Sequence, residues 1–273
     1  MVSCLSCFGK KSNGVDSQGP VMSPVGQMHN ASVSMFSAVD GERNSVTSFV
    51  SFELDERDDK LAELEARGRS TVRLFKSLVE DKTGLVANGS VGDTSLWFAP
   101  RSVGGMPLIA VGEVRVSGSV SLDRIAAIIM ELSTKSDWDP EFLMGKEISR
   151  SQIDESTWIR TCWAACKSKP AIAGRDFVYH AFNERTESSW VVASWSVDID
   201  ECPPDFAPKV ASAVHVRGKV FLGGFFVRKD DNSWLISYAN QVDVGISSWL
   251  SEPVLKKNPQ LLNKLKFVLE KIE

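Results

Sequence analysis

Side chains that could carry out catalysis are few and scattered in this sequence. The three histidines stand at positions 29, 180 and 215. No Gly-x-Ser-x-Gly motif, glycine-rich phosphate loop or metal-spaced cluster of His and Cys accompanies them. Glu147, Asp154 and Glu184 are available acids, and solvation at the surface accounts for each of them. The residue types therefore favour binding over catalysis, and no enzyme activity, cofactor or metal site is predicted.

The first residues of the chain suggest a different chemistry. Cys4 and Cys7 lie beside Phe8 and shortly before Lys10 and Lys11. Acyl chains on both cysteines would hold the protein on a membrane, whereas a single chain binds only weakly. The two cysteines also form an isolated CxxC, but no second pair follows at a zinc-ligand spacing. Both an acylated and an unmodified tail fit this sequence.

Composition excludes several classes of protein. Hydrophobic residues make up 43% of the 273 residues and charged residues 24%, as is ordinary for a soluble globular protein. The net charge of -4 leaves no basic excess with which to neutralise phosphates, so nucleic acid is not an expected partner. No apolar run approaches the roughly 20 residues of a membrane span. We expect a cytoplasmic monomer with reduced cysteines.

The chain divides into a tail and one folded domain. Residues 1–52 are rich in Ser, Gly and Asn and are predicted to be mostly disordered, while residues 53–273 form the domain. Apolar spacing predicts a helix over residues 54–79, and the glycines of residues 83–93 predict a loop. Ser121 is expected to cap a second helix.

The middle of the domain is predicted to be an antiparallel meander. Turn-rich pieces separate short apolar runs, and such short connections favour antiparallel pairing. Alternation around residues 214–222 predicts a sheet with one dry and one wet face. The predicted strands cover residues 96–99, 109–117, 142–153, 157–167, 176–185, 190–198, 211–228 and 233–243.

The last stretch, residues 245–272, carries apolar side chains three or four apart, as one face of an amphipathic helix does. Pro253 and Pro259 interrupt the pattern and should bend or break the helix. Such an apolar stripe must be buried against something large. The sequence therefore predicts an α+β fold in which a curved antiparallel sheet wraps around a long C-terminal helix.

Six short stretches follow one another in an order that can be recognised. They are Trp138-Asp139-Pro140, Arg175-Asp176-Phe177-Val178, Ser194-Trp195-Ser196-Val197, the segment 214–227 with Gly223-Gly224-Phe225 in its middle, the segment 238–243 (Tyr-Ala-Asn-Gln-Val-Asp) and Ser248-Trp249-Leu250. In this order they resemble the START (StAR-related lipid transfer) domain family, over roughly residue 54 to the C-terminus. The resemblance implies a helix-grip fold with an internal tunnel for one lipid, which such domains bind and move between membranes without chemistry on it.

The resemblance also suggests which lipid. Sterol-binding members carry a glutamate and an arginine on two neighbouring strands, and these positions align here with Cys162 and Ala181. A buried ion pair of that kind is therefore not predicted. In the phosphatidylcholine-carrying branch, a basic residue and an aspartate lie near the phosphate, and Lys135 and Asp139 match them.

Aromatic side chains surround the choline in that branch. Trp163, after a one-residue shift, and Tyr179 match two of these positions, while a third falls at Lys219. A quaternary ammonium over such rings gains about 2 kcal/mol when desolvated. A phospholipid is thus favoured over a sterol, although ordinary core packing explains the same aromatics. The predicted lipid-binding residues are Lys135, Asp139, Cys162, Trp163, Tyr179, Ala181, Ser196, Asn240 and Gln241.

Two loops and the last helix are predicted to form the entrance, and apolar side chains there would touch a membrane. The predicted gate residues are Ile172, Phe206, Trp249, Leu250 and Pro253. Two rival functions remain. One is a membrane-tethered lipid sensor that keeps its ligand, and the other is a helix-grip hydrolase or cyclase acting on a lipid-like substrate.

Overall fold

The computed structural model describes residues 46–99, 107–168, 173–198, 201–202, 215–246 and 255–271, with side chains from residue 58 onwards. Contacts divide the chain into two units, residues 1–48 and 49–273, and the second unit contains the fold described below. The predicted disordered tail lies largely outside the described residues. Its last part is helical, however, because α1 (Val46–Asp81) begins earlier than the sequence pattern indicated.

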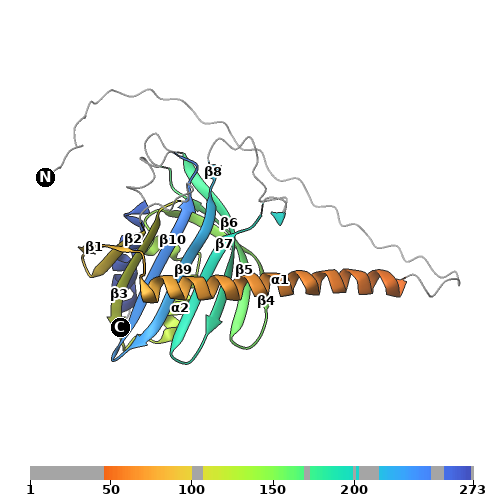
Figure 1. Ribbon diagram of the computed structural model, residues 1–273, viewed down its shortest axis with the longest axis horizontal. Coiled ribbons are helices and arrows are strands. Elements are labelled where there is room, and N and C mark those ends of the chain that lie inside the picture. The colour runs from red at the N-terminus through yellow and green to blue at the C-terminus, as the bar shows by residue number, and fades with distance from the viewer. Residues whose placement is uncertain are drawn as a thin grey trace, which may run out of the picture. The chain divides into compact units, whose positions relative to one another are not determined.

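One curved sheet makes up most of the second unit (Figure 1). Its strands lie in the order β1-β2-β3-β10-β9-β7-β6-β5-β4, all paired antiparallel, and β8 adds a short parallel pairing to β6. The strands are β1 (Val86–Val91), β2 (Thr94–Ala99), β3 (Ile109–Ser117), β4 (Phe142–Gln152), β5 (Thr157–Cys166), β6 (Gly174–Arg185), β7 (Ser189–Ser196), β8 (His215–Arg217), β9 (Lys219–Asp230) and β10 (Ser233–Asp243).

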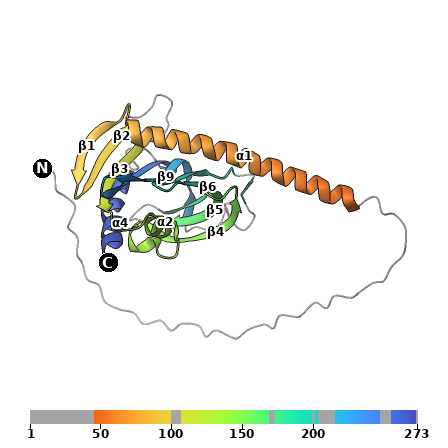
Figure 2. The same cartoon turned by 90° about the horizontal axis from the view of Figure 1, so that it is seen from below.

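Helices lie on both sides of this sheet. Figure 2 shows α1 along one face, and α2 (Leu122–Met130) and α4 (Leu261–Glu270) on the other. We call these the outer and the inner face. Ser121 caps α2 as predicted, since its side chain accepts a hydrogen bond from the backbone of Arg124. The described helices do not include one that is long and apolar enough to cross a bilayer.

Both faces are dry at the centre of the sheet, so the prediction of one dry and one wet face was wrong. On β7, Val191 belongs to the cluster beneath α1, and its neighbour Val192 belongs to the cluster beneath α2 and α4. The alternation of the strand sends successive side chains to opposite faces, and a helix covers each. Val216, in the alternating segment around residues 214–222 on which the prediction rested, is 44% exposed.

Besides α1, three elements differ from the prediction by more than two residues. The expected loop at residues 83–93 contains β1, because Gly89 (φ +74°) allows a bulge and Gly92 (φ +57°) a tight turn inside a hairpin with β2. The expected strand 211–228 is divided at Gly218 into β8 and β9. The last helix, α4, begins only at Leu261, after the 3-10 turn η4 (Asn258–Gln260) that contains Pro259. Proline lacks the N–H group that a continuous helix needs there.

Candidate functional site

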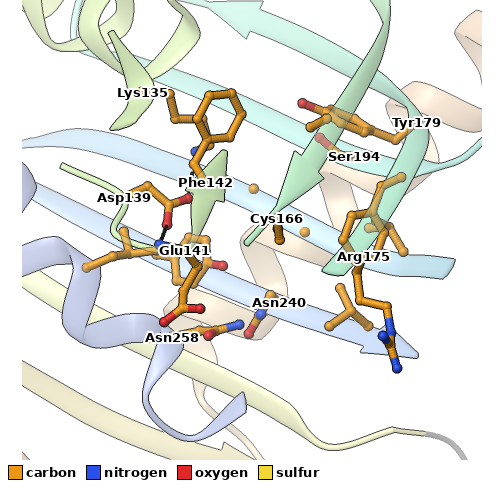
Figure 3. Close-up of a pocket in the computed structure, with 18 of the residues that line it drawn as sticks. Lys135, Asp139, Glu141, Phe142, Cys166, Arg175, Tyr179, Ser194, Asn240 and Asn258 are labelled. Atoms are coloured by element: carbon orange, nitrogen blue, oxygen red, sulfur yellow. Dashed lines mark hydrogen bonds and ion pairs between the residues drawn. The ribbon is translucent and has the colours of Figure 1, made fainter. Parts of the chain in front are cut away.

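The inner face of the sheet does not pack completely against its helices. A cavity of about 540 Å³ remains between α2, η4, α4 and the concave side of strands β4–β7, β9 and β10 (Figure 3). This volume lies within the roughly 300–1,000 Å³ of typical small-molecule sites. Apolar side chains form much of its wall, for example Phe177, Val192, Val220, Phe225 and Leu261.

Two consecutive glycines on β9 help to keep this space open. Gly224 has φ +154°, and a Cβ there would lie 1.9 Å from the carbonyl oxygen of Val192, so the position excludes other residues. At Gly223 the nearest atom to such a Cβ would be a Val220 methyl carbon at 3.5 Å, an ordinary contact. A larger side chain at Gly223 would therefore fit the strand and project into the cavity.

A charged pair enters the wall at the short helix η1 (Lys135–Asp137). The ammonium of Lys135 lies 3.3 Å from Asp139 Oδ2 and 3.9 Å from the centre of the Trp138 ring. Burial lowers the pKa of Lys135, and the neighbouring Asp139 carboxylate acts in the opposite direction. Arg175 does not pair with Asp139, because its guanidinium donates to the carbonyl oxygens of Ala173, Gly174 and Val244.

A second charged pair was missed by the sequence analysis. Arg160 on β5 is buried in the cavity wall, and its Nη1 donates to Glu147 Oε2 on β4 and to the Met130 carbonyl oxygen, both at 3.1 Å. Glu147 also binds Arg150, and these bonds lower the pKa of Glu147. No ion pair was predicted at Cys162 and Ala181, and this pair joins two other positions, on β4 and β5. Alternation along β5 could have indicated Arg160, two residues before Cys162.

Polar groups elsewhere in the wall come from β6, β7 and β10. Tyr179 and Tyr238 line the cavity, and burial raises the pKa of both phenols. Asn240 is only 6% exposed, and within the described residues its Oδ1 accepts no hydrogen bond. Arg160 Nε is also buried without such a partner. A ligand in the cavity could satisfy both groups.

The structure brings together five of the predicted binding residues and places the other four elsewhere. The five that line the cavity are Lys135, Asp139, Tyr179, Ala181 and Asn240. Cys162 is buried between Glu147 of β4 and Tyr179 of β6, and it is absent from the cavity wall. Burial raises the pKa of its thiol.

Strand alternation explains two of the remaining three residues, and a hydrogen bond between strands explains the third. Trp163 lies on the face of β5 opposite to Ala164, and its Nε1 donates to Asp176 Oδ2 at 3.0 Å. Gln241 likewise faces away from the cavity and donates to the carbonyl oxygen of Pro107. Ser196 accepts a hydrogen bond from the backbone of Val220, so its hydroxyl fastens two strands. A shift of one residue reverses the face of a strand, and the shift assumed for Trp163 was wrong.

Other predicted residues lie outside the part of the chain that the structure describes. They are the gate residues Ile172, Phe206, Trp249, Leu250 and Pro253, and the acylation candidates Cys4 and Cys7. Lys219, which takes the third choline position, is exposed at the start of β9. Among the described residues, no group of three or more His, Cys, Asp and Glu side chains could hold a metal ion.

The family model of the START domain matches residues 98–258, which is more than half of the chain. The chain belongs to the START domain family. START domains bind and transfer lipids and are in general not enzymes. The predicted family and the helix-grip fold are therefore confirmed.

Solved structures agree on the fold of this START domain. Human StAR-related lipid transfer protein 5 is 14% identical, with a TM-score of 0.63, and the match covers 77% of this chain and 98% of that one. Human STARD10 is 15% identical, with a TM-score of 0.59 and coverage of 73% and 78%. A StAR-related lipid transfer protein from Xanthomonas axonopodis is 19% identical, with a TM-score of 0.53 and coverage of 68% and 99%. No curated protein sequence matches the chain significantly.

Proposed function

We propose that this START domain encloses one lipid, a phospholipid rather than a sterol, and carries it between membranes. The observation that supports the proposal is the cavity of about 540 Å³ on the inner face of the sheet. Each lipid methylene in water costs about 0.8 kcal/mol, so one acyl chain of about sixteen carbons costs on the order of 10 kcal/mol. A carrier lowers this barrier by keeping the chain away from water.

The polar part of the wall suits a phospholipid head group. Lys135 and Asp139 lie on η1 and the turn that follows it, and they supply donors and an acceptor near a phosphate. Tyr179 and Asn240 face the same cavity from β6 and β10. A sterol presents a single hydroxyl and would leave most of these groups without partners, which is unfavourable in a buried site.

We propose that the C-terminal segment is the gate. Leu255 lines the cavity ahead of η4, and Leu261 and Lys264 line it from α4. Displacement of this segment would therefore open the wall. The predicted gate residues Trp249, Leu250 and Pro253 precede it in the sequence. Peripheral contact with the membrane at this edge would let a lipid pass without crossing water.

Filling the cavity tests the proposal. Gly223→Ile adds a branched side chain to β9 at a position where a Cβ would meet no atom closer than 3.5 Å and which lines the cavity, so the domain should fold with a thermal midpoint close to that of the original protein. Lipid that co-purifies, measured by native mass spectrometry, and exchange between two vesicle populations should both fall at least tenfold. The matched control is Ala87→Ile on the exposed strand β1, which should change neither quantity. Full transfer by Gly223→Ile would contradict the proposal.

The sensor alternative differs from a carrier in kinetics. A tether at Cys4 and Cys7 would keep the protein on one membrane, in which case one lipid binds each protein without speeding exchange between vesicles. Exchange measured with the full chain, with and without Cys4→Ser and Cys7→Ser, separates the two functions. We expect exchange in both samples.

A further inference from the structure

The cavity wall carries an excess of positive charge, although the chain as a whole has a net charge of -4. Among the described residues that line the cavity, the acids are Asp139 and Glu141. The basic residues of the wall are Lys135, Arg160, Lys167, Arg175, Lys257 and Lys264. Figure 3 shows Lys135, Asp139, Glu141 and Arg175 at the edges of this space. Composition does not explain a local excess of this size.

Protein carboxylates neutralise only part of this excess. Lys135 forms an ion pair with Asp139. Arg160 forms an ion pair with Glu147, and Glu147 also pairs with Arg150. Among the described residues no carboxylate lies within 4.0 Å of the Arg175 guanidinium, which is 8% exposed and binds backbone carbonyl oxygens instead. A buried cation without an opposite charge is unfavourable, because it has lost its hydration and gained no counter-charge.

The C-terminal edge of the cavity adds two further cations. Lys257 and Lys264 are exposed side chains that line the cavity from the segment around η4 and from α4. Among the described residues, neither ammonium forms an ion pair, whereas Lys266 on the same helix pairs with Asp93 at 2.7 Å. Lys167, at the end of β5, donates to the Pro140 carbonyl oxygen at 2.9 Å, which brings no counter-charge.

Only one of the three predicted choline positions, Tyr179, lines the cavity. Trp163 faces away from the cavity, and the third choline position is the exposed Lys219. Two buried polar atoms in the wall require partners of opposite kinds, since within the described residues Arg160 Nε lacks an acceptor and Asn240 Oδ1 lacks a donor. An anionic oxygen group that also carries a hydroxyl or amine would satisfy both.

We infer that the lipid held in this cavity has an anionic head group, such as that of phosphatidic acid or phosphatidylserine, in preference to zwitterionic phosphatidylcholine. The inference rests on the proposed lipid-binding function and narrows its ligand class. The charge of the head group replaces the missing carboxylates and balances the excess of basic side chains in the wall, Lys257 and Lys264 among them. The acyl chains then occupy the apolar part of the wall around Phe177, Val192 and Phe225.

The test uses competition on a single membrane surface. Vesicles contain mostly phosphatidylcholine with a small fraction of phosphatidic acid or of phosphatidylserine, all with identical acyl chains. The full-length protein is incubated with them and re-isolated, and its bound lipids are counted by mass spectrometry. Because both lipids come from the same surface, the ratio of bound lipids does not depend on how strongly the protein docks. We expect anionic lipid to be enriched at least tenfold over its fraction in the vesicle.

Two double variants locate the effect. Lys257→Gln with Lys264→Gln removes two cations of the wall that form no ion pair within the described residues, and enrichment should fall by about fivefold, a factor of about two to three for each lysine. The matched control is Lys256→Gln with Lys271→Gln, an equal change of charge on the same segment. These lysines lie over the rings of Phe98 and Phe267 and do not line the cavity. The control should keep the full enrichment.

Each outcome decides between the two proposals. Equal or preferred uptake of phosphatidylcholine overturns the anionic head group and leaves lipid binding intact. Enrichment that the two double variants lower equally overturns the assignment to the cavity wall. Failure to take up any phospholipid overturns the proposed function and this inference with it. A third arm with a free fatty acid of the same chain length separates a carboxylate from a phosphate as the bound group, and uptake of the fatty acid alone overturns the assignment to an anionic phospholipid.

Discussion

The two faces of the sheet are built from the same strands but are packed in opposite ways. On the outer face, Phe75 and Val79 of α1 are fully buried against Phe182 and Phe226. On the inner face, α2 and α4 leave a cavity of about 540 Å³. Close packing of the outer face stabilises the fold, while the inner face gives up part of that stabilisation to hold a ligand.

Gly68 shows how tight the outer face is. A Cβ at this position would lie 2.1 Å from Cδ2 of Phe182, so α1 can approach the sheet only because the residue is glycine. Gly223 has the opposite role, since a Cβ there would meet nothing closer than 3.5 Å. Substitutions on the outer face should therefore affect stability, and substitutions on the inner face should affect binding.

The largest effect is expected for Phe75→Ala. This side chain is 0% exposed at the centre of the outer cluster, and its removal should lower the free energy of unfolding by about 3–5 kcal/mol. Lipid binding by the folded fraction should not change. The control is Leu74→Ala, since Leu74 is 61% exposed on the same helix and should cost less than about 0.5 kcal/mol. Urea unfolding measures both, and a loss of lipid binding in folded Phe75→Ala would contradict the division between the faces.

The next effect concerns pH and also belongs to the outer face. His180 lies against Trp195, and burial lowers its pKa to about 4, while charged side chains of Glu201, Arg67, Lys60 and Asp198 have smaller effects. The His180 imidazole takes up a proton near pH 6.5 in the unfolded chain, but only near pH 4 in the folded chain. Stability should therefore fall as the pH drops through this window, by roughly 2–3 kcal/mol from this group.

Replacing His180 with Gln removes that contribution. The variant should lose less stability than the original protein between pH 6.5 and 4, as followed by thermal melts at each pH. Parallel curves for the two proteins would show that His180 is not held neutral. In the structure, His180 Nδ1 forms a hydrogen bond with Thr161 Oγ1 at 3.1 Å.

Gly68→Ala is expected to change the free energy of unfolding less, and in the direction opposite to that of the same change in an exposed helix. In an exposed helix this change stabilises by about 1 kcal/mol, but here the methyl group would collide with the buried Phe182 ring. We expect a net loss of about 1–2 kcal/mol in the free energy of unfolding. Ser70→Ala, on the exposed side of α1, provides the control and should stabilise slightly. A stabilised Gly68→Ala protein would mean that α1 is not closely packed on the sheet.

The smallest change in stability is expected on the inner face. Asn240→Leu replaces a buried amide whose Oδ1 lacks a partner, so the free energy of unfolding should stay constant or rise by up to about 1 kcal/mol. Lipid binding should fall severalfold. Its neighbour Gln241 faces away from the cavity and donates to Pro107, so Gln241→Leu should lose about 1 kcal/mol and keep its lipid. Urea unfolding measures the stability of both variants, and mass spectrometry measures their bound lipid. Loss of lipid by Gln241→Leu but not by Asn240→Leu would contradict this assignment of faces.

Electrostatics separate the faces as well. On the outer side, cations such as Arg69 find carboxylates at Glu65, Asp154 and Glu184. In the cavity wall, Arg175 donates to carbonyl oxygens, and no carboxylate of the described residues lies within 4.0 Å of it. Exposed pairs of the first kind contribute little to stability. A buried cation without a carboxylate beside it can instead be neutralised by an anionic ligand.

The sequence by itself determined the local elements and the family. Alternating apolar residues located strand β3 at its observed bounds and most of β4 to β7, because alternation is a property of neighbouring residues. The cap at Ser121 and the order of the short motifs were equally local. They also indicated Lys135, Asp139, Tyr179, Ala181 and Asn240 for the site.

Only the tertiary structure decided which side chains share a space. Register and strand parity turned Trp163 and Gln241 away from the cavity, joined Glu147 to Arg160 across β4 and β5, and brought α1 onto a face predicted to be wet. Each of these depends on contacts between residues far apart in the sequence. A difference of one residue in register reverses a face, so no local pattern could have fixed them.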